Sequence, residues 1–579
     1  MADITAPEYI SPYVVTTAGG LVLDRDVYTM PVGAASILQN FEPSVKGGYR
    51  RLSGTSKYST SQVGSSSATI LGVAVFNSGV VVAQSTNVYF GTGGTWSDPA
   101  IDTGRTSAGR YRFEKYNFTT NEERLIFTDD ANFASVYNGT TVMDIKGSTV
   151  LAKTGSASSS STSLSVTDAS GIIAGMYITG TSVGSGAKVS SISGTTVTMS
   201  VATTGTISSA TVNFAGLGTA PTDPSMVAAF KNHMFYAGMS SEPNTITFSA
   251  PGDENDFSAG NGAGSLNVDS TIVALKSFRD SLIIFCEDRI YKLEGSTGDD
   301  FAVAPVSRNV GCSDAYSVQE IGGDVIFLAP DGLRTIAGTA RIGDVELGTV
   351  SKQIQDRISD VGFNKISSVV IRNKSQYRLF YPTTGGVESA SKGIIGVLKS
   401  NPSGQIGWEY SDIRGIKPAC CDSGFVSGTE KIVHGGFDGY VYLQESGNTF
   451  AGTAMTAIYR SPDLTMGDAG IRKNMQRINV NYDPEGAVNV SMFMKYDFED
   501  ASTPQPSAYT LTTADTAAVY GDSGALYGSA VYDAEGIPIV RQSVEGSGFT
   551  VVVRLEDTSS NPPITLKGFE LEFTPGARM

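Results

Sequence analysis

The stretch Asp324-Val-Ile-Phe-Leu-Ala-Pro-Asp-Gly-Leu-Arg-Thr-Ile336 places a Pro-Asp-Gly turn between two apolar runs of strand length. Asp suits such a turn because its side chain caps its own backbone, and Gly suits it because Gly accepts a positive φ. The stretch therefore predicts a β-hairpin. The same pattern recurs in five other segments, at 79–90, 124–138, 233–248, 282–293 and 431–443.

The spacing of these hairpins predicts the architecture. Apart from two long intervals, successive copies lie roughly 40–50 residues apart, which is typical of β-propeller blades. Segments 376–381, 393–398 and 408–410 supply a further blade. A lone blade leaves two edges unpaired and a face exposed, whereas blades packed around an axis bury those faces. We therefore predict an all-β fold built on a β-propeller of six or seven blades.

One long interval, residues 150–220, has its own composition. It opens with a Ser-rich run at 155–163, which predicts a flexible linker. Short segments that alternate in polarity follow and predict half-buried strands. We predict a small inserted β module whose nearly uncharged surface favours protein contact; a decorated surface loop without a partner is the alternative.

The C-terminal part changes character, because the hairpin repeat ends and longer strands begin near Thr453. These strands predict a β-sandwich-like domain. The clearest helix starts at Ser351 as N-cap and places Ile354, Ile358 and Val361 on one face. The predicted division is an N-terminal segment for ring contacts and propeller closure (1–58), propeller (59–149), insert (150–220), propeller (221–449) and C-terminal β domain (450–579).

Composition excludes several classes of protein. The 579 residues include 66 Gly and carry a net charge of −16, so neither a mostly helical fold nor a broad basic surface for nucleic acid is expected. Four cysteines without a Cys-x-x-Cys pair argue against a disulfide framework or a zinc site. The N-terminus lacks a secretory pattern, and the apolar runs are far shorter than the ~20 residues of a membrane helix. We expect synthesis in the cytoplasm and no membrane insertion.

Two strings resemble serine-hydrolase motifs. Gly180-Thr-Ser-Val-Gly184 fits G-x-S-x-G, but it lies in an all-β segment without the required strand-to-helix turn. Gly521-Asp-Ser-Gly524 matches a protease nucleophile string, yet that mechanism needs an oriented His. The chain has only His233 and His434, both near predicted blade hairpins. Both matches are interpreted as chance.

Charged clusters complete the search for chemistry. The acidic run 252–257 lacks the ligand spacing of a calcium loop and is interpreted as a solvated turn. Glycoside hydrolysis by two carboxylates across a cleft stays open as a weaker hypothesis. The basic residues Arg50, Arg51, Arg105, Arg110 and Arg112, the last two beside Tyr111 and Phe113, are interpreted as a solvated face or a subunit contact. We predict no catalytic, cofactor-binding or metal-ligating residue, no cofactor and no enzyme activity.

Several of these segments resemble a known family. The string at 37–55, Ile-Leu-Gln-Asn-Phe-Glu-Pro-Ser-Val-Lys-Gly-Gly-Tyr-Arg-Arg-Leu-Ser-Gly-Thr, looks like the opening of tail nozzle proteins of short-tailed bacteriophages, also called tail tubular protein B. Segments 248–258, 285–293, 306–312 and 322–334 are similar to those proteins and to the packaged-DNA stabilisation (tail hub) proteins. The resemblance spans roughly 30–58 and 225–445 and leaves out the insert and the C-terminal domain.

The resemblance implies a homohexameric ring in the virion tail, below a tail adaptor protein and in contact with tail fibres or spikes. In that family the ring surrounds the DNA exit channel, retains the packaged genome and permits its ejection, which involves contact with duplex DNA without sequence specificity. A net charge of −16 per copy suits a bore along which DNA slides. Two other classes stay open: a propeller-type tail protein that binds a receptor or degrades polysaccharide, and a surface-layer or adhesin-like module.

Overall fold

The computed structural model describes residues 11–26, 29–106, 109–118, 122–148, 151–215, 217–337, 349–359, 365–381, 392–400, 406–513 and 539–578. Strands dominate these ranges, so the all-β prediction is confirmed. The described residues include the short α-helix α2 (Gln355–Ser359), and no helix among them is long and apolar enough to cross a membrane. The short 3-10 helices are η1 (Val63–Ser65), η2 (Ala259–Asn261), η3 (Ala315–Ser317), η4 (Lys352–Ile354), η5 (Arg372–Lys374) and η7 (Asp497–Glu499).

Seven small antiparallel sheets, named I to VII here, follow one another along the chain. Sheets I to III contain β6 (Ile70–Phe76), β7 (Gly79–Gln84), β8 (Asn87–Thr92) and β9 (Thr95–Trp96); β10 (Arg112–Tyr116), β11 (Arg124–Thr128), β12 (Ser135–Tyr137) and β13 (Val142–Asp144); and β22 (Met226–Phe230), β23 (His233–Ala237), β24 (Thr245–Phe248) and β25 (Gly264–Asn267). Sheets IV and V contain β26 (Ile272–Phe278), β27 (Ser281–Cys286), β28 (Ile290–Glu294) and β29 (Ala302–Ser307); and β30 (Gln319–Ile321), β31 (Asp324–Ala329) and β32 (Gly332–Thr335).

Sheets VI and VII complete the series. Sheet VI contains β33 (Ser367–Ile371), β34 (Gln376–Tyr381), β35 (Lys392–Ser400) and β36 (Ile406–Arg414), and sheet VII contains β37 (Cys420–Val426), β38 (Thr429–Gly435), β39 (Val441–Gln444) and β5 (Thr55–Lys57). All six predicted hairpins are present, as β7–β8, β11–β12, β23–β24, β27–β28, β31–β32 and β38–β39.

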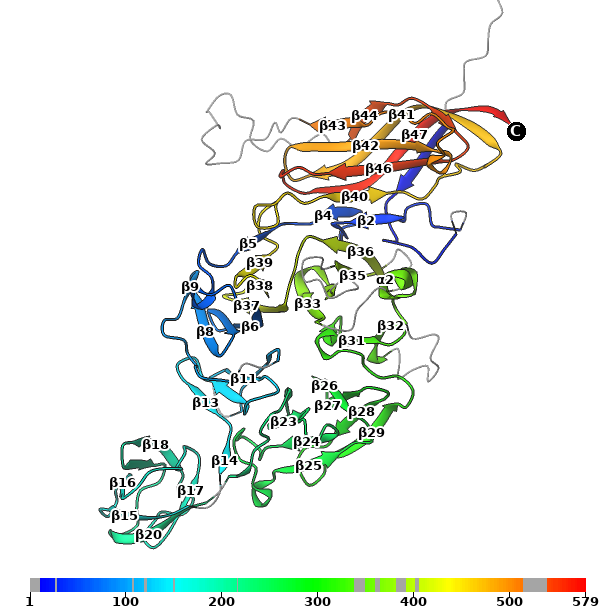
Figure 1. The fold of residues 1–579 in the computed structure, drawn as a ribbon. Helices are drawn as coiled ribbons and strands as arrows, with labels where there is room; N and C mark the ends of the chain where they lie inside the picture. Colours follow the sequence, from blue (N-terminus) through cyan, green and yellow to red (C-terminus); the bar gives the residue numbers. More distant parts are fainter. Residues whose placement is uncertain are drawn as a thin grey trace, which may run out of the picture.

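The seven sheets lie around a ring (Figure 1). Each sheet shares a buried hydrophobic cluster with the next, and the last shares one with the first, where Cys420 and Val433 of sheet VII pack with Ile70 and Val82 of sheet I. Sheets I and II approach closely on the inner side: a Cβ on Gly72 of β6 would lie 2.5 Å from the Cβ of Tyr111, the residue before β10. Packing each face against a neighbour removes from water the apolar surface that a single small sheet would expose.

Sheet VII is assembled from both ends of this region. Strand β5 pairs with β39, with Ser56 opposite Leu443, although the two strands are almost 390 residues apart in sequence. The edge of the last sheet is thereby covered by the segment that precedes the first sheet. Such pairing joins the two ends of the series and protects an otherwise open strand edge.

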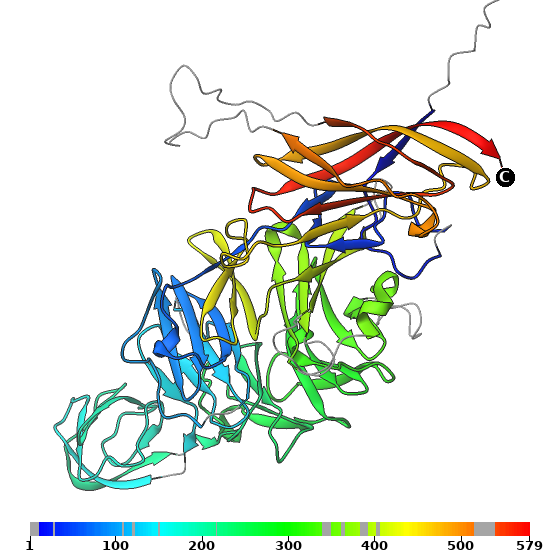
Figure 2. The same ribbon diagram turned by 45° about the horizontal axis from the view of Figure 1, so that its top comes forward.

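Two larger sheets form layers above the ring. One contains β1 (Ser11–Thr16), β3 (Phe41–Pro43), β4 (Tyr49–Arg51), β41 (Ile471–Pro484), β44 (Ile539–Ser543), β45 (Ser547–Gly548) and β47 (Ile564–Arg578). The other continues from β36 of sheet VI through β2 (Ile37–Gln39), β40 (Ala457–Arg460), β46 (Val551–Asp557), β42 (Val488–Tyr496) and β43 (Tyr509–Thr513). N-terminal strands therefore lie among C-terminal ones (Figure 2), and β2 bonds to both β36 and β40, so the layers and the ring share one continuous sheet.

The segment 151–215 folds into a sheet of its own, with strands β15 (Leu151–Ala157), β16 (Ser163–Val166), β17 (Tyr177–Thr179), β18 (Val189–Ser193), β19 (Thr196–Met199) and β20 (Ile207–Ala215). It has a separate hydrophobic core and joins the ring through the short pair β14 (Gly147–Ser148) and β21 (Gly218–Thr219). The prediction of a flexible linker at 155–163 is wrong at its start. Gly155 and Ser156 belong to β15 and lie opposite Val166 and Ser165 of β16. The hydrogen bonds between β15 and β16 order this part of the Ser-rich run, although its composition favours a flexible linker.

The helix expected after Ser351 is present only in part. It consists of η4 followed by α2, with Ile354 and Ile358 buried, and Val361 lies outside the described residues. Ser351 does not cap it with its side chain; its Oγ accepts a hydrogen bond from the Leu333 amide of β32 instead. The hydroxyl thus fixes the helix to sheet V.

Candidate functional site

The residues of the hydrolase-like strings do not come together. Gly180–Gly184 lies in the insert, and Gly521–Gly524 lies outside the described residues. His233 is buried in sheet III, where its Nδ1 lies 2.6 Å from the Ser249 carbonyl oxygen and its ring contacts Phe248 and Phe301. His434 is buried in sheet VII and stacks on Tyr442 with ring centroids 5.0 Å apart. Both histidines serve as core residues.

The acidic run 252–257 is not the solvated turn predicted for it. Glu254, Asn255 and Asp256 are buried. Arg124 donates to Glu254 Oε1 at 2.7 Å, and the Gly147 amide donates to Asn255 Oδ1 at 3.1 Å. These carboxylate and amide oxygens accept bonds from fixed protein donors beside the neck of the insert. Among the described residues, no group of three or more His, Cys, Asp or Glu side chains is arranged to hold a metal ion.

The basic residues singled out in the sequence are also more buried than a solvated face. Arg51 is fully buried and forms an ion pair with Asp557. Arg105 donates from Nε and Nη2 to Asp129 Oδ2 at 3.1 and 3.0 Å. Arg110 and Arg112 line a cavity at the centre of the ring. Their spacing in the sequence gave no sign of this, because the sequence does not show which strand of each sheet faces the axis.

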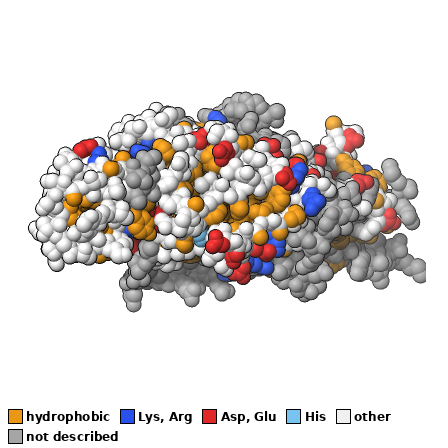
Figure 3. Space-filling model, turned by 90° about the horizontal axis from the view of Figure 1, so that it is seen from below, with side chains coloured by type: hydrophobic (Ala, Val, Ile, Leu, Met, Phe, Trp, Pro, Cys, Tyr) orange, Lys and Arg blue, Asp and Glu red, His pale blue; other side chains and the backbone are white. Residues whose placement is uncertain are grey.

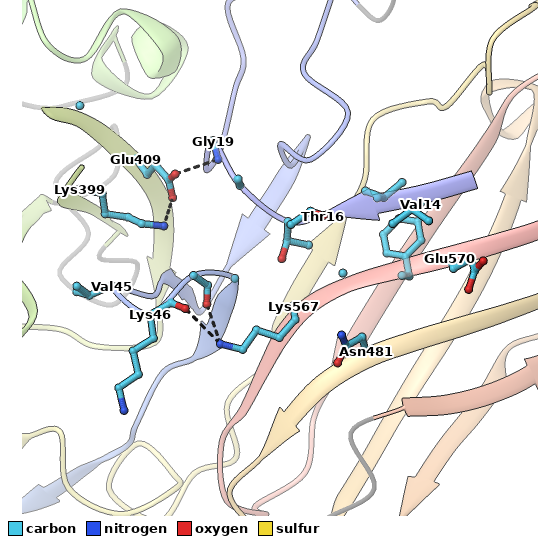
Figure 4. A pocket seen from close by; sticks show the side chains of 18 of the residues that line it. Val14, Thr16, Gly19, Val45, Lys46, Lys399, Glu409, Asn481, Lys567 and Glu570 are labelled. Atoms are coloured by element: carbon cyan, nitrogen blue, oxygen red, sulfur yellow. Dashed lines mark hydrogen bonds and ion pairs between the residues drawn. The ribbon is translucent and has the colours of Figure 1, made fainter. Parts of the chain in front are cut away.

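A larger cavity, of about 1040 Å³, opens where the ring meets the layered sheets (Figure 4). We call it the junction groove. Its walls come from eight parts of the chain: the end of β1 with the residues after it, the β3–β4 turn, Gln353 of η4, Lys399 of β35, the start of β36, the middle of β41, the start of β44, and β47. The groove therefore exists only because the N-terminal strands pair with the C-terminal ones.

Three aliphatic side chains of this groove are exposed. Val14, Val45 and Ile539 have exposed fractions of 68%, 60% and 44%, and they come from β1, the β3–β4 turn and β44. Isolated exposed aliphatic residues are common, but several gathered around one concave surface are typical of a contact site. Sequence reasoning missed them, because Val14 and Val15 are adjacent and only the register of β1 against β47 decides which one is buried.

The polar groups of the junction groove hold one another. Lys399 Nζ lies 3.1 Å from Glu409 Oε2, and the Gly19 amide donates to Glu409 Oε1 at 3.1 Å. Lys567 Nζ donates to the carbonyl oxygens of Gly47 at 3.2 Å and Lys46 at 3.5 Å. A general acid or base must reach a substrate with a free proton site. These groups instead bond to one another or to the backbone, and the groove surface combines exposed aliphatic side chains with lysines.

Comparisons with known proteins identify no family for this chain. No family model and no curated protein matches it. Solved structures similar to it include the computationally designed Ika8 protein (12% identity, 67% of this chain and 99% of that chain, TM-score 0.33), Saccharomyces cerevisiae Sqt1 (10%, 67% and 98%, 0.32) and an exo-β-1,3-galactanase from Phanerochaete chrysosporium (10%, 90% and 100%, 0.22). Likenesses at this level carry no conclusion about this protein.

Proposed function

We propose that the protein is a non-enzymatic structural subunit of a short-tailed bacteriophage tail, a nozzle or hub protein, and that its seven sheets are the blades of a seven-bladed β-propeller. The blade count is supported by the shared clusters between successive sheets and by the packing of β37 against β6, the last sheet against the first. Strand β5 within sheet VII supports closure by the N-terminal segment.

The observation that carries the functional proposal is the junction groove. Its aliphatic side chains Val14, Val45 and Ile539 are exposed to solvent, and a partner surface would bury them. The groove is also lined by three lysines and two glutamates: Lys46, Lys399, Lys567, Glu409 and Glu570. The whole chain has a net charge of −16, so a second copy is on balance attracted to a patch with an excess of lysine. We therefore assign a second copy of this chain as the occupant, in a head-to-tail contact that repeats around a ring.

The residues behind the phage resemblance occupy structural positions that fit this role. The string 37–55 forms β2 to the start of β5, which connect the ring to the layered sheets. Phe41 and Tyr49 from it are fully buried. A rigid connection of this kind lets a subunit hold neighbours on one part while another part carries the propeller.

The proposal places DNA outside the propeller. The cavity on the propeller axis has a volume of about 340 Å³ and is lined by inward side chains, so duplex DNA cannot thread it. In the assembly, the genome would pass through the bore between subunits, and retention and ejection would depend on that bore. The insert, whose surface carries few charged side chains (Figure 3), would face neighbouring subunits or tail fibres.

The groove contact is tested by charge substitution. We expect Val14→Asp and Val45→Asp to lower the oligomeric state of the purified protein while the fold persists, as measured by native mass spectrometry and circular dichroism. Val32→Asp is the matched control, because Val32 is 41% exposed and does not line the groove. An unchanged oligomer in both groove variants, or equal loss in the control, would refute the groove as the subunit contact.

A further inference from the structure

A second cavity lies on the axis of the ring. It is lined by the strands that begin all seven sheets: β6, β10, β22, β26, β30, β33 and β37. Its volume of about 340 Å³ leaves room for small ions and water. Each sheet therefore contributes side chains to one central chamber, which we call the axial chamber.

The axial chamber is rich in cations although the protein as a whole is acidic. Among the described residues, five basic side chains line it and two carboxylates do, Glu114 and Asp422. The whole chain has a net charge of −16, so this excess of positive charge runs against the composition. The basic residues are Arg110, Arg112, Lys115, Lys276 and Arg372.

Two of the arginines share one aromatic ring. The Arg110 guanidinium carbon lies 3.6 Å from the centroid of the Tyr316 ring, and that of Arg112 lies 4.3 Å from the same centroid. The ring attracts each cation, but the two guanidinium groups repel each other. Arg110 donates from Nη1 to the Ile366 carbonyl oxygen, while its buried Nε and Nη2 have no hydrogen-bond acceptor. An arginine with two donors unused is costly in an enclosed site.

The carboxylates that line the chamber are fewer than these cations, and they are buried beside them. Burial raises the pKa of Glu114, and the charge of Lys276 opposes the rise only in part. Burial also raises the pKa of Asp422 and of Asp314, which lies near the arginine pair. Arg372 stands at the mouth with a half-exposed side chain and pairs with Glu430 at 3.6 Å. Arg110, Arg112, Lys115 and Lys276 therefore outnumber the two lining carboxylates, Glu114 and Asp422, even with Arg372 paired to Glu430.

We propose that the axial chamber binds a phosphate-type oxyanion, held by Arg110 and Arg112 and balanced by Lys115 and Lys276. Guanidinium groups match the oxygen pairs of phosphate with parallel, charge-assisted hydrogen bonds. Such an anion screens the two stacked arginines from each other and accepts the bonds that Arg110 lacks. The ligand is free phosphate or the terminal phosphate of a nucleotide. This inference is independent of the phage proposal and of the junction groove.

The test uses the full-length protein and inorganic phosphate. We expect saturable binding by isothermal titration calorimetry and a rise in melting temperature relative to chloride at equal ionic strength. Arg112→Gln should weaken binding roughly tenfold to a hundredfold, since each charge-assisted bond contributes on that scale. Arg308→Gln removes the same charge at an exposed position outside the chamber and should bind like the wild type. Titration with ATP in place of phosphate shows whether the chamber takes the terminal phosphate of a nucleotide or free phosphate alone.

A crystallographic arm keeps the inference testable if the arginine variants unfold. A crystal soaked in selenate should give an anomalous peak beside Arg110 and Arg112, and phosphate should abolish it by competition. Absence of saturable phosphate binding by the folded wild type, equal binding by Arg112→Gln and wild type, or a selenate peak only outside the chamber would each overturn the inference.

Discussion

Arg51 Nε lies 3.2 Å from Asp557 Oδ2, and the two side chains are 0% and 2% exposed. Arg51 belongs to β4 in one of the layered sheets, and Asp557 ends β46 in the other. Arg51 also donates to the carbonyl oxygens of Asn561 at 2.6 Å and Ser559 at 2.7 Å. One buried guanidinium thus ties β4 of one layered sheet to the end of β46 in the other and to the loop that follows it.

Loss of this ion pair should destabilise the protein strongly. Arg51→Met leaves Asp557 charged, buried and without its cation, so we expect the free energy of unfolding to fall by about 3–5 kcal/mol. Urea denaturation followed by fluorescence measures the change. Arg25→Met removes a cation from an exposed pair and should cost less than about 1 kcal/mol. Equal losses in the two variants would show that the Arg51 pair does not hold the sheets together.

Glu445 should make stability depend on acid pH. Burial raises its pKa, but the charges and hydrogen bonds of Arg378 and Lys374 outweigh this effect and lower the pKa to about 2 from 4.5. A lowered carboxyl pKa stabilises the fold above pH 4.5, and this contribution disappears as the pH falls toward 2. Glu445→Gln should therefore be less stable than the wild type at pH 7, and the difference should shrink at pH 3. A difference that stays constant with pH would contradict this assignment.

Buried His434 should also make the protein less stable at acid pH, because it stays neutral in the folded state. Burial lowers its pKa to about 3 from 6.5, so it stays neutral in the fold while the unfolded chain takes up a proton below pH 6.5. Stability is thus lost as the pH falls from 6.5 toward 3. His434→Phe keeps a ring against Tyr442 and should lose less stability between pH 7 and 4.5 than the wild type does. Thermal melts at the two pH values measure this, and parallel losses would disprove it.

The insert should be removable without unfolding the remainder. It has its own hydrophobic core, and one two-stranded neck joins it to the ring. Replacing residues 150–216 with a short Gly-Ser linker should leave the far-UV spectrum of a β protein and a cooperative melt. The Lys188–Asp253 ion pair at 3.5 Å joins the insert to the β24–β25 loop of sheet III, so we expect its loss to lower the melting temperature by no more than a few degrees. Loss of the cooperative transition would mean that the insert is part of the ring core.

Much of the local structure was predictable from the sequence, and most of the long-range pairing was not. The hairpins could be identified because apolar runs, turn residues and strand length all lie within about a dozen residues. The pairing of β1 with β47, or of Thr55 with Gln444, joins segments hundreds of residues apart and leaves no local pattern. The buried state of Asp256 was equally hidden, because its partner Asn261 and the neighbouring amide of Ser258 satisfy it only in the folded loop.

The candidate sites were hidden for a related reason. To predict the junction groove, one must know the register of β1 against β47. To predict the axial chamber, one must know that the first strands of seven sheets meet at the axis of the ring. The sequence singled out Arg110 and Arg112 as a basic group beside aromatic residues. It could not show that the aromatic ring they contact is Tyr316, which is about 200 residues away.

The most direct test of the structural role is electron microscopy of the purified full-length protein, with native mass spectrometry on the same sample. We expect a closed ring of six copies with the junction groove at each contact and a bore wide enough for duplex DNA. A protein that stays monomeric at micromolar concentration, and that releases reducing sugar from host polysaccharide, would contradict it.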